Sequence, residues 1–277
     1  MTAMHVVTTE TGIGRVENDE IALLDSPFSD LGALLRETGS LEVLDAAPVV
    51  GRVQVGSTRL LAPLGVPRAI WGIGLNYRSK AERTGRSLPT EPILFLATPA
   101  AVLAPGGSVA LPAAATRELD YEAEIAVVIG RTLYCAEADE VWPSIAGITA
   151  ANDMTARDVM RSTANPTLAK SFAGFKPLGA SVCTLAELPD RDSIRVRSWV
   201  NGELQQDDTS AGLIFSIPEL IARISRYAPL RPGDVVLTGT PAGTGQDRNC
   251  FLTPGDDIRI EVGPVLPLLT SVVPATA

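Results

Sequence analysis

The chain has 277 residues, of which 45% are hydrophobic and 20% are charged, and its formal net charge is −9. This length suits one large domain, or a small domain joined to a large one, and allows a sizeable core. The hydrophobic content argues against disorder, and the acidic balance argues against nucleic acid as a partner, because its phosphates would be repelled. An anionic ligand would need local cations or a metal ion to counter the general field.

Nothing in the sequence indicates export or membrane insertion. The N-terminal residues lack the basic and apolar segments of a signal peptide, and no apolar run reaches the ~18–20 residues that cross a bilayer. Cys135, Cys183 and Cys250 are odd in number and widely spaced, which is typical of reduced thiols. We therefore expect a soluble cytoplasmic protein with no membrane partner.

Residues 1–66 predict a small N-terminal domain. Two strands and a helix are expected, at residues 4–9, 20–24 and 29–38. The helix places Leu31, Leu34 and Leu35 on one face, and Gly39 can end it. The Pro- and Gly-containing segment 61–67 has the composition of a linker.

Residues 67–277 predict a larger, mostly β domain with peripheral helices. Strands are expected at residues 125–129, 194–200, 234–237 and 257–262, and a helix at 217–226. Pro-Gly-Asp turns at 232–234 and 254–256 each lead into a strand. Strands dominate without regular β-α alternation, so the fold class is α+β and a parallel doubly wound sheet is not expected.

Three carboxylates form the most informative pattern in the chain. Glu122 and Glu124 lie two apart in a strand-like run, so both side chains should leave the same face. Asp153 could close the site from a neighbouring element. Three carboxylates give an all-oxygen site suited to Mg²⁺, Mn²⁺ or Ca²⁺, and the lack of His and Cys ligands argues against zinc. The alternative is a solvated strand face on which the glutamates pair with Lys or Arg.

Two glycine-containing segments resemble nucleotide-binding loops only superficially. Residues 72–77 begin like a dinucleotide fingerprint, but Tyr77 stands in place of the third glycine. Residues 238–245 lack the lysine of a P-loop. This second segment could still offer backbone N–H groups and Thr240 to an anionic ligand, or it could be a plain tight turn.

Several other polar residues allow a structural or a functional interpretation. Lys170 could pair with a glutamate or bind a substrate carboxylate, and Gln206 could face a pocket or lie in a loop. Arg157 and Asp158 favour a local ion pair or a helix cap. Asn201-Gly202 is a strong hairpin signal.

Seven short motifs in order resemble the fumarylacetoacetate hydrolase family over about residues 70–273. They are Gly74-Leu-Asn-Tyr77, Asp120-Tyr-Glu-Ala-Glu124, Asn152-Asp-Met-Thr-Ala-Arg-Asp158, Ala169-Lys-Ser-Phe172, Val200-Asn-Gly202, Leu237-Thr-Gly-Thr-Pro241 and Pro254-Gly-Asp256. Each motif alone is weak, but the ordered set at sensible spacing is specific.

The resemblance implies a C-terminal mixed β-roll with a Mg²⁺ or Mn²⁺ site, a small N-terminal domain, and usually a homodimer. Members of the family hydrolyse C–C bonds of β-diketo acids, decarboxylate oxo acids, or tautomerise and hydrate related dienols. Carried over by motif, the metal ligands would be Glu122, Glu124 and Asp153.

The resemblance also implies a set of substrate contacts. Lys170 would contact the substrate or the metal shell, and Thr240 would bind the oxo-acid end. Gln206 would lie near the pocket, and Asn76 and Tyr77 are further candidates for substrate binding.

The chain departs from the family where water is usually activated. Lys80 and Arg83 occupy the places of a common His-Glu pair, and the only histidine is His5. A lysine and an aspartate that are common in the family are replaced by Ala97 and Ala173. We expect Lys80 to act as a charged proton donor or, with Arg83, as a substrate anchor; the alternative is a solvated lysine on a mobile lid.

These observations predict a metal-dependent enzyme that acts on a small oxo acid or β-dicarbonyl through a metal-stabilised enolate. The reaction could be C–C bond hydrolysis or lysis, decarboxylation or isomerisation. Two alternatives are cyclisation in a natural-product pathway and a non-catalytic binding protein, although the complete carboxylate set argues against the second. Specificity would lie in the lid at residues 80–89 and in the residues near Gln206 and Gly243.

Overall fold

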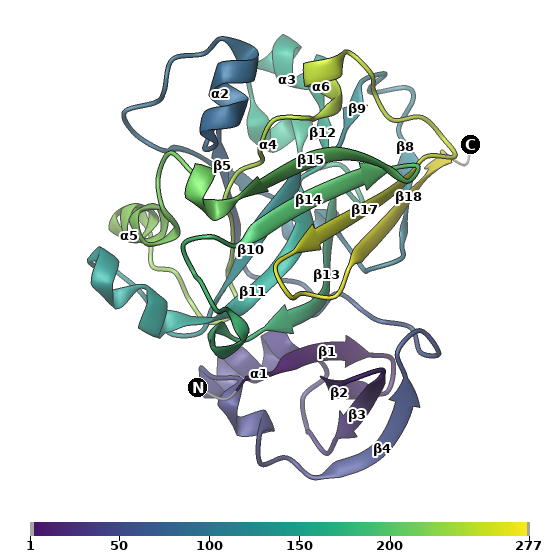
Figure 1. The fold of residues 1–277 in the computed structure, drawn as a ribbon, viewed down its shortest axis with the longest axis vertical. Coiled ribbons are helices and arrows are strands. Elements are labelled where there is room, and N and C mark those ends of the chain that lie inside the picture. The colour runs from purple at the N-terminus through teal and green to yellow at the C-terminus, as the bar shows by residue number, and fades with distance from the viewer. Residues whose placement is uncertain (1–2, 276–277) are drawn as a thin grey trace.

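The fold was analysed in a computed structural model that describes residues 3–275 (Figure 1). The α-helices are α1 Leu31–Thr38, α2 Arg78–Thr84, α3 Arg157–Thr163, α4 Pro166–Ala169, α5 Ile217–Tyr227 and α6 Gly245–Arg248. Short 3₁₀ helices cover Glu42–Leu44, Pro99–Ala101, Ala138–Glu140, Trp142–Ser144, Leu185–Glu187 and Ser210–Gly212. The first nine strands are β1 His5–Thr9, β2 Gly12–Glu17, β3 Glu20–Leu24, β4 Val49–Gln54, β5 Ile70–Gly74, β6 Ile93–Ala97, β7 Val102–Leu103, β8 Ser108–Leu111 and β9 Leu119–Asp120. The later strands are β10 Ala123–Ile129, β11 Ile145–Asn152, β12 Thr155–Ala156, β13 Lys176–Cys183, β14 Arg195–Val200, β15 Glu203–Thr209, β16 Val235–Leu237, β17 Asp257–Val262 and β18 Leu268–Pro274.

Two large sheets dominate the molecule. An 11-stranded sheet runs in the order β4-β3-β2-β1-β13-β11-β10-β16-β5-β6, with β7 beside β13. A five-stranded sheet runs β15-β14-β17-β18-β8, and β9 and β12 form a small pair. Most neighbouring strands are antiparallel, and the parallel pairs are β5–β16, β7–β13 and β8–β18. The mostly β, α+β class is confirmed.

The two longest helices form where the apolar spacing predicts them. The side chain of Asp30 caps α1 by accepting from the backbone N–H of Ala33, so the helix begins at Leu31, and Gly39 ends it in the left-handed conformation at φ 70°. A capping box of Ser216 and Glu219 starts α5. Both apolar faces are buried, which confirms the two predicted helices.

Three predicted turns adopt the geometry that their residues favour. Gly233 and Gly255, each preceded by proline, have φ values of 84° and 103°, as the third residue of a type II turn requires. Asn201 and Gly202 have φ values of 52° and 82° and join β14 to β15. Two consecutive positive φ angles are the signature of a type I′ hairpin.

The N-terminal unit is continuous with the rest of the protein in its sheet and in its core. Strand β1 pairs with β13, at His5 with Cys183 and at Val6 with Val182. One buried apolar cluster combines Leu31, Leu34 and Leu35 of α1 with residues of β10, β13 and β16. The predicted chain boundary near residue 66 therefore does not divide two independent hydrophobic cores.

The larger core lies between the two sheets and fixes the strands that carry the site. Ile125 and Val127 of β10 are buried with Val196 of β14 and Ile258 and Ile260 of β17. Within residues 3–275 no helix has the length and apolar character that crossing a membrane requires.

Because the cores are joined, a change in the N-terminal unit should destabilise the whole chain. We expect Leu34→Ala to lower the free energy of unfolding by about 2–5 kcal/mol. The three tryptophans lie at 71, 142 and 199, so tryptophan fluorescence in a urea titration reports only on residues beyond 66. Its midpoint should fall together with that of far-UV circular dichroism.

The control for this prediction is Val50→Ala, at a side chain that is 66% exposed on β4, which should change stability by less than about 0.5 kcal/mol. A tryptophan transition that stays in place in Leu34→Ala while part of the dichroism signal melts earlier would show two independent units.

Candidate active site

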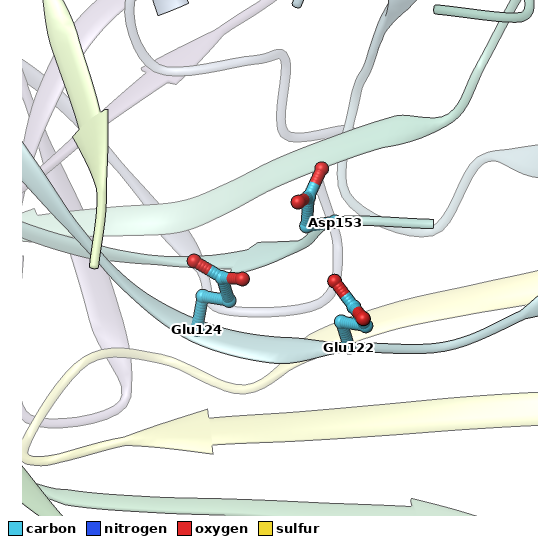
Figure 2. A group of neighbouring side chains, drawn as sticks. All are labelled: Glu122, Glu124 and Asp153. Carbon is cyan, nitrogen blue, oxygen red and sulfur yellow. The ribbon is translucent and has the colours of Figure 1, made fainter. Parts of the chain in front are cut away.

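The three carboxylates meet where β10 pairs with β11 (Figure 2). Glu122 directly precedes β10 and Glu124 lies within it, and their side chains rise from the same face. Asp153 directly follows β11, and its N–H donates to the carbonyl of Glu122 at 2.9 Å. One oxygen from each carboxylate lies within 4.8 Å of the others. The exposed fractions of 6%, 1% and 1% exclude the solvated strand face.

Three cations surround two of the carboxylates. Lys170 contacts both Glu122 and Asp153. The ammonium of Lys176 lies 2.8 Å from Oδ1 of Asp153, close enough for an ion pair, although that oxygen accepts no well-aligned hydrogen bond. Arg157 contacts Glu122 and binds Asp120 at 2.7 Å through Nε.

These cations make the carboxylates electrostatically unequal. Burial alone would raise the pKa of Glu122, but Arg157 and Lys170 outweigh burial and lower that pKa to about 2. Glu124 accepts one hydrogen bond, from the N–H of Gly239 at 2.7 Å. Burial, followed by repulsion from Asp153 and Glu122, raises the pKa of Glu124 well above its ordinary value.

The geometry of Glu124 fits a divalent cation. None of the ion pairs among residues 3–275 involves Glu124, yet it is buried beside two other carboxylates. A cation held by all three groups would remove this unfavourable charge, and the all-oxygen donor set suits Mg²⁺ or Mn²⁺.

A cleft of about 210 Å³ leads from the surface to this cluster. Its lining includes Glu122 and Glu124. It also includes Lys80, Lys170 and Thr240, which the sequence predicts as site residues, and Arg157. A larger hollow, of about 760 Å³, lies on the outer face of the five-stranded sheet. We place the active site in the smaller cleft because the buried carboxylates open into it.

Lys80 is fixed and buried, so the alternative of a solvated lid lysine is wrong. Its side chain extends from α2 to α6, where Nζ lies 2.6 Å from Thr244 Oγ1 and 2.7 Å from Asp247 Oδ1. Lys80 is 7% exposed. Burial, together with Arg157, lowers its pKa, and Asp247 opposes this effect. Arg83, one turn further, donates to the carbonyl of Asp247 at 3.0 Å and is exposed.

Asn76 and Tyr77 support the cleft from behind. The amide of Asn76 donates to the carbonyls of Thr238 and Phe215, and its oxygen accepts from the N–H of Phe215. Tyr77 is fully buried and is the N-cap residue of α2. Neither residue lines the cleft, so their direct contact with substrate stays a prediction that this arrangement does not support.

Gln206 and Thr240 form one hydrogen-bonded unit against β10. The Gln206 amide donates to Thr240 Oγ1 at 2.8 Å, and its oxygen accepts from the N–H of Ala123 at 3.0 Å. Thr240 in turn donates to the carbonyl of Ala123. Thr240 lines the cleft and Gln206 does not, so Gln206 positions Thr240 and the strand that carries the glutamates.

Several backbone N–H groups of the loop at 238–245 bind carboxylates of this chain. The N–H of Gly239 donates to Glu124, that of Gly243 to Asp247, and that of Gly245 to Asp120. Gly239 has φ 101°, and an added Cβ would lie 2.8 Å from the Asn76 side chain. These three N–H groups are thus occupied, which does not support the first of the two alternatives, that they bind an external anion.

The expected pairing of Arg157 with Asp158 is wrong. Arg157 points inward to Asp120 and Glu122, whereas Asp158 accepts from the hydroxyl of Thr116 and from the N–H of Arg117. Adjacent residues at the start of a helix point to different faces, and the buried carboxylates attract the arginine.

Sequence reasoning missed Asp120 and Lys176 as parts of the site. Asp120 accepts from Arg157 and from the N–H groups of Gly245 and Gln246. The signal for Asp120 was its spacing of two from Glu122. The signal for Lys176 was a lysine at the start of a strand of eight buried residues.

His5 lies too far away to replace the missing imidazole. It pairs with Cys183 at one end of β13, and Lys176 stands at the other end. Seven residues of strand separate them, roughly 23 Å at ~3.3 Å per residue. Imidazole chemistry is thus absent from the described site.

Comparison with known proteins supports the family resemblance that the sequence motifs indicate. Residues 69–273 match the family profile described as fumarylacetoacetate (FAA) hydrolase C-terminal. The chain belongs to this family. Over 218 residues it is 35% identical to the mitochondrial oxaloacetate tautomerase Fahd2a of Rattus norvegicus. The aligned region covers 78% of this chain and 68% of that protein. It is 34% identical to the oxaloacetate tautomerase YisK of Bacillus subtilis over 216 residues, or 76% of this chain and 72% of that one.

A solved structure shows the same fold over the full length. The 2-hydroxyhepta-2,4-diene-1,7-dioate isomerase from Mycobacterium marinum superposes with a TM-score of 0.80 at 26% sequence identity and covers both chains completely. These three proteins are named for tautomerase or isomerase reactions.

Proposed function

We propose that this protein is a metal-dependent tautomerase or isomerase that interconverts the keto and enol forms of a small 2-oxo acid. The observation that carries the proposal is Glu124, a buried carboxylate without a cation partner among the described residues, in a cluster that opens into the cleft. The reactions named for the relatives support it.

Glu122, Glu124 and Asp153 would hold Mg²⁺ or Mn²⁺. When bound, such an ion supplies a Lewis acid that stabilises the enolate of a chelated oxo acid. Lys170 and Arg157 line the same cleft and add positive charge where the anionic substrate binds. Because both cations are paired with carboxylates and the chain as a whole carries −9, the surplus positive charge that makes the cleft attractive to an anion would come from the bound ion.

Lys80 is the proposed proton donor. It is a buried ammonium that lines the cleft, and Asp247 and Thr244 hold it in place. In the enol-to-keto direction it would give its proton to the carbon beside the enol carbon, while the enol hydroxyl releases its proton to water and the amine is reprotonated from water. In the reverse direction the amine would take the proton from that carbon, and the oxygen would regain one from water. Burial lowers the pKa of Lys80, which brings the proton closer to the range in which transfer is efficient.

Isomerisation needs less of the site than hydrolysis does. Hydrolysis requires a base that activates water in addition to stabilisation of the enolate. Lys80 and Arg83 both bind α6 and provide no carboxylate or imidazole at the positions of the usual pair. A keto–enol conversion needs only the metal and one positioned proton donor. The carboxylate cluster would hold the metal, and Lys80 would donate the proton.

The metal assignment predicts loss of binding when the two glutamates are neutralised. We expect Glu122→Gln/Glu124→Gln to bind no Mn²⁺ in a calorimetric titration with pyruvate present and to lose the stabilisation by Mg²⁺ in a thermal melt, about 2.7 kcal/mol at a hundred times the dissociation constant. Glu17→Gln/Glu20→Gln removes the same charge from the N-terminal sheet and should behave as wild type. Unchanged Mn²⁺ stoichiometry in the first variant would refute the ligand set.

The role of Lys80 predicts a large effect on turnover. We expect Lys80→Met to lower kcat for ketonisation of enol-oxaloacetate, followed by the loss of enol absorbance, by about 10²–10⁴-fold, the usual contribution of a general acid. Lys80→Arg keeps the charge but not a transferable proton, so it should restore KM and not kcat. Wild-type turnover in Lys80→Met would refute the role of Lys80 and leave the metal as the only catalyst. Hydrolysis of acylpyruvates by the wild-type protein would contradict the assignment as an isomerase.

We also propose a homodimer that forms through the outer face of the five-stranded sheet. One cross-strand row on this face consists of Leu204, Trp199, Arg259 and Leu269, which are register partners on β15, β14, β17 and β18. Both leucines are 51% exposed, and among the described elements none covers this face in Figure 1.

The charges on this face suit a two-fold symmetric contact. Arg197 and Arg259 flank the ring of Trp199 at 5.0 and 5.7 Å, and both arginines bind Glu261. A face that carries both signs around an apolar centre can be complementary to itself. The hollow of about 760 Å³ beside it leaves room for side chains of a second copy.

This arrangement predicts that Trp199→Glu is monomeric in sedimentation velocity at micromolar concentration, because the substitution buries an unpaired charge at the contact. Val50→Glu, on the exposed edge strand β4, should leave the wild-type dimer intact. A wild-type monomer would refute the dimer, and a dimeric Trp199→Glu would move the interface elsewhere.

A further inference from the structure

A lysine that the proposed reaction does not use lies beneath the carboxylate cluster. Lys176 begins β13 and is 2% exposed. Its ammonium lies 2.8 Å from Asp153 Oδ1, donates to the carbonyl of Phe175 at 3.0 Å and also contacts the carbonyl of Lys170. Lys176 does not line the cleft, so it cannot contact a substrate that binds there.

The surroundings of Lys176 require the charged form. All of its described partners are oxygens: one carboxylate oxygen and the carbonyls of Met154, Lys170 and Phe175. An ammonium has three donors and no acceptor, whereas a neutral amine would direct its lone pair at one of these oxygens. Burial lowers the pKa of Lys176, and Asp153 opposes this effect; the geometry of the surrounding oxygens favours the ammonium form behind Asp153.

Lys176 changes the charge balance of the cluster by one unit. In their ionised forms the connected groups are four carboxylates, Asp120, Glu122, Glu124 and Asp153, and three cations, Arg157, Lys170 and Lys176. The cluster thus carries one net negative charge, and a divalent ion would make it positive by one. A bound 2-oxo acid with one carboxylate would return it to neutrality.

We propose that Lys176 makes metal binding and binding of the anionic substrate depend on each other. The repulsion between its buried charge and a divalent ion weakens binding of the metal alone. The carboxylate of an oxo acid offsets the surplus charge, so each ligand strengthens the binding of the other, as thermodynamic linkage requires. This inference rests on the metal site of the proposed function and assigns Lys176 as a positioning residue.

The location of Lys176 explains why it can act in this way while Lys170 cannot. Lys170 lines the cleft and contacts two carboxylates, so it lies where a ligand can meet it directly. Lys176 is held from behind by backbone carbonyls and cannot move toward solvent when a metal arrives. Its charge therefore acts on the metal in every state of the site.

The test is calorimetric titration of Mn²⁺ into the wild-type protein and into Lys176→Met, each with and without saturating pyruvate. For the wild type we expect pyruvate to tighten Mn²⁺ binding by about tenfold or more, within the usual range of coupling. Lys176→Met should bind Mn²⁺ alone about tenfold more tightly than the wild type, and pyruvate should then change its affinity by less than about threefold.

Lys176→Arg is the matched control, because it keeps the charge and should keep the coupling. If Lys176→Met fails to fold, the wild type and Lys176→Arg still test the inference. Tight Mn²⁺ binding without pyruvate in either protein would overturn it. Equal Mn²⁺ affinity in wild type and Lys176→Met would overturn it while leaving the proposed function intact. No Mn²⁺ binding by the wild type under either condition would overturn both.

Discussion

The antiparallel pairing of β10 with β11 is the constraint on which the site depends. Ala123 pairs with Asn152, so the residues just outside this pair, Glu122 and Asp153, are brought together at the end of the ladder. A shift of one residue would turn Glu122 and Glu124 to the other face. The register is fixed by the buried apolar residues that follow Glu124 along β10, all of which lie in the core.

A chain of shared partners connects this ladder to the helix above the cleft. Asp120 receives the N–H groups that begin α6 and also binds Arg157, which contacts Glu122. Asp247 in α6 receives Lys80 from α2. Asp120, Glu122 and Asp247 each have at least two cationic or N–H partners and cannot move without exposing one of them. The position of Lys80 therefore depends on the same buried charges that would hold the metal.

The sequence was sufficient for the elements whose cause is local. The helix at 217–226, the strand at 257–262 and the hairpin at Asn201-Gly202 follow from apolar spacing, capping residues and residues that accept positive φ. The carboxylate cluster was also predictable, because a spacing of two on a strand fixes the shared face, and the family motif supplied Asp153. These features depend on at most two neighbouring segments.

The partners of the charged side chains could not be predicted in the same way. Arg157 binds Asp120 and Glu122 across 37 and 35 residues, and Lys80 binds Asp247 across 167. The partner of each cation is a buried carboxylate that comes near it only in the folded chain. No local sequence pattern predicts such a pair. The continuity of the N-terminal sheet with β13 is equally non-local, since it requires a pairing between His5 and Cys183.

The replaced lid residues indicate how the family site changes its chemistry without changing its fold. A histidine and a glutamate at positions 80 and 83 would be free to act on water, whereas Lys80 and Arg83 are both bound to α6. Under the proposed function, the two replacements together would remove a water-activating base and place a fixed ammonium, that of Lys80, at the lining of the cleft.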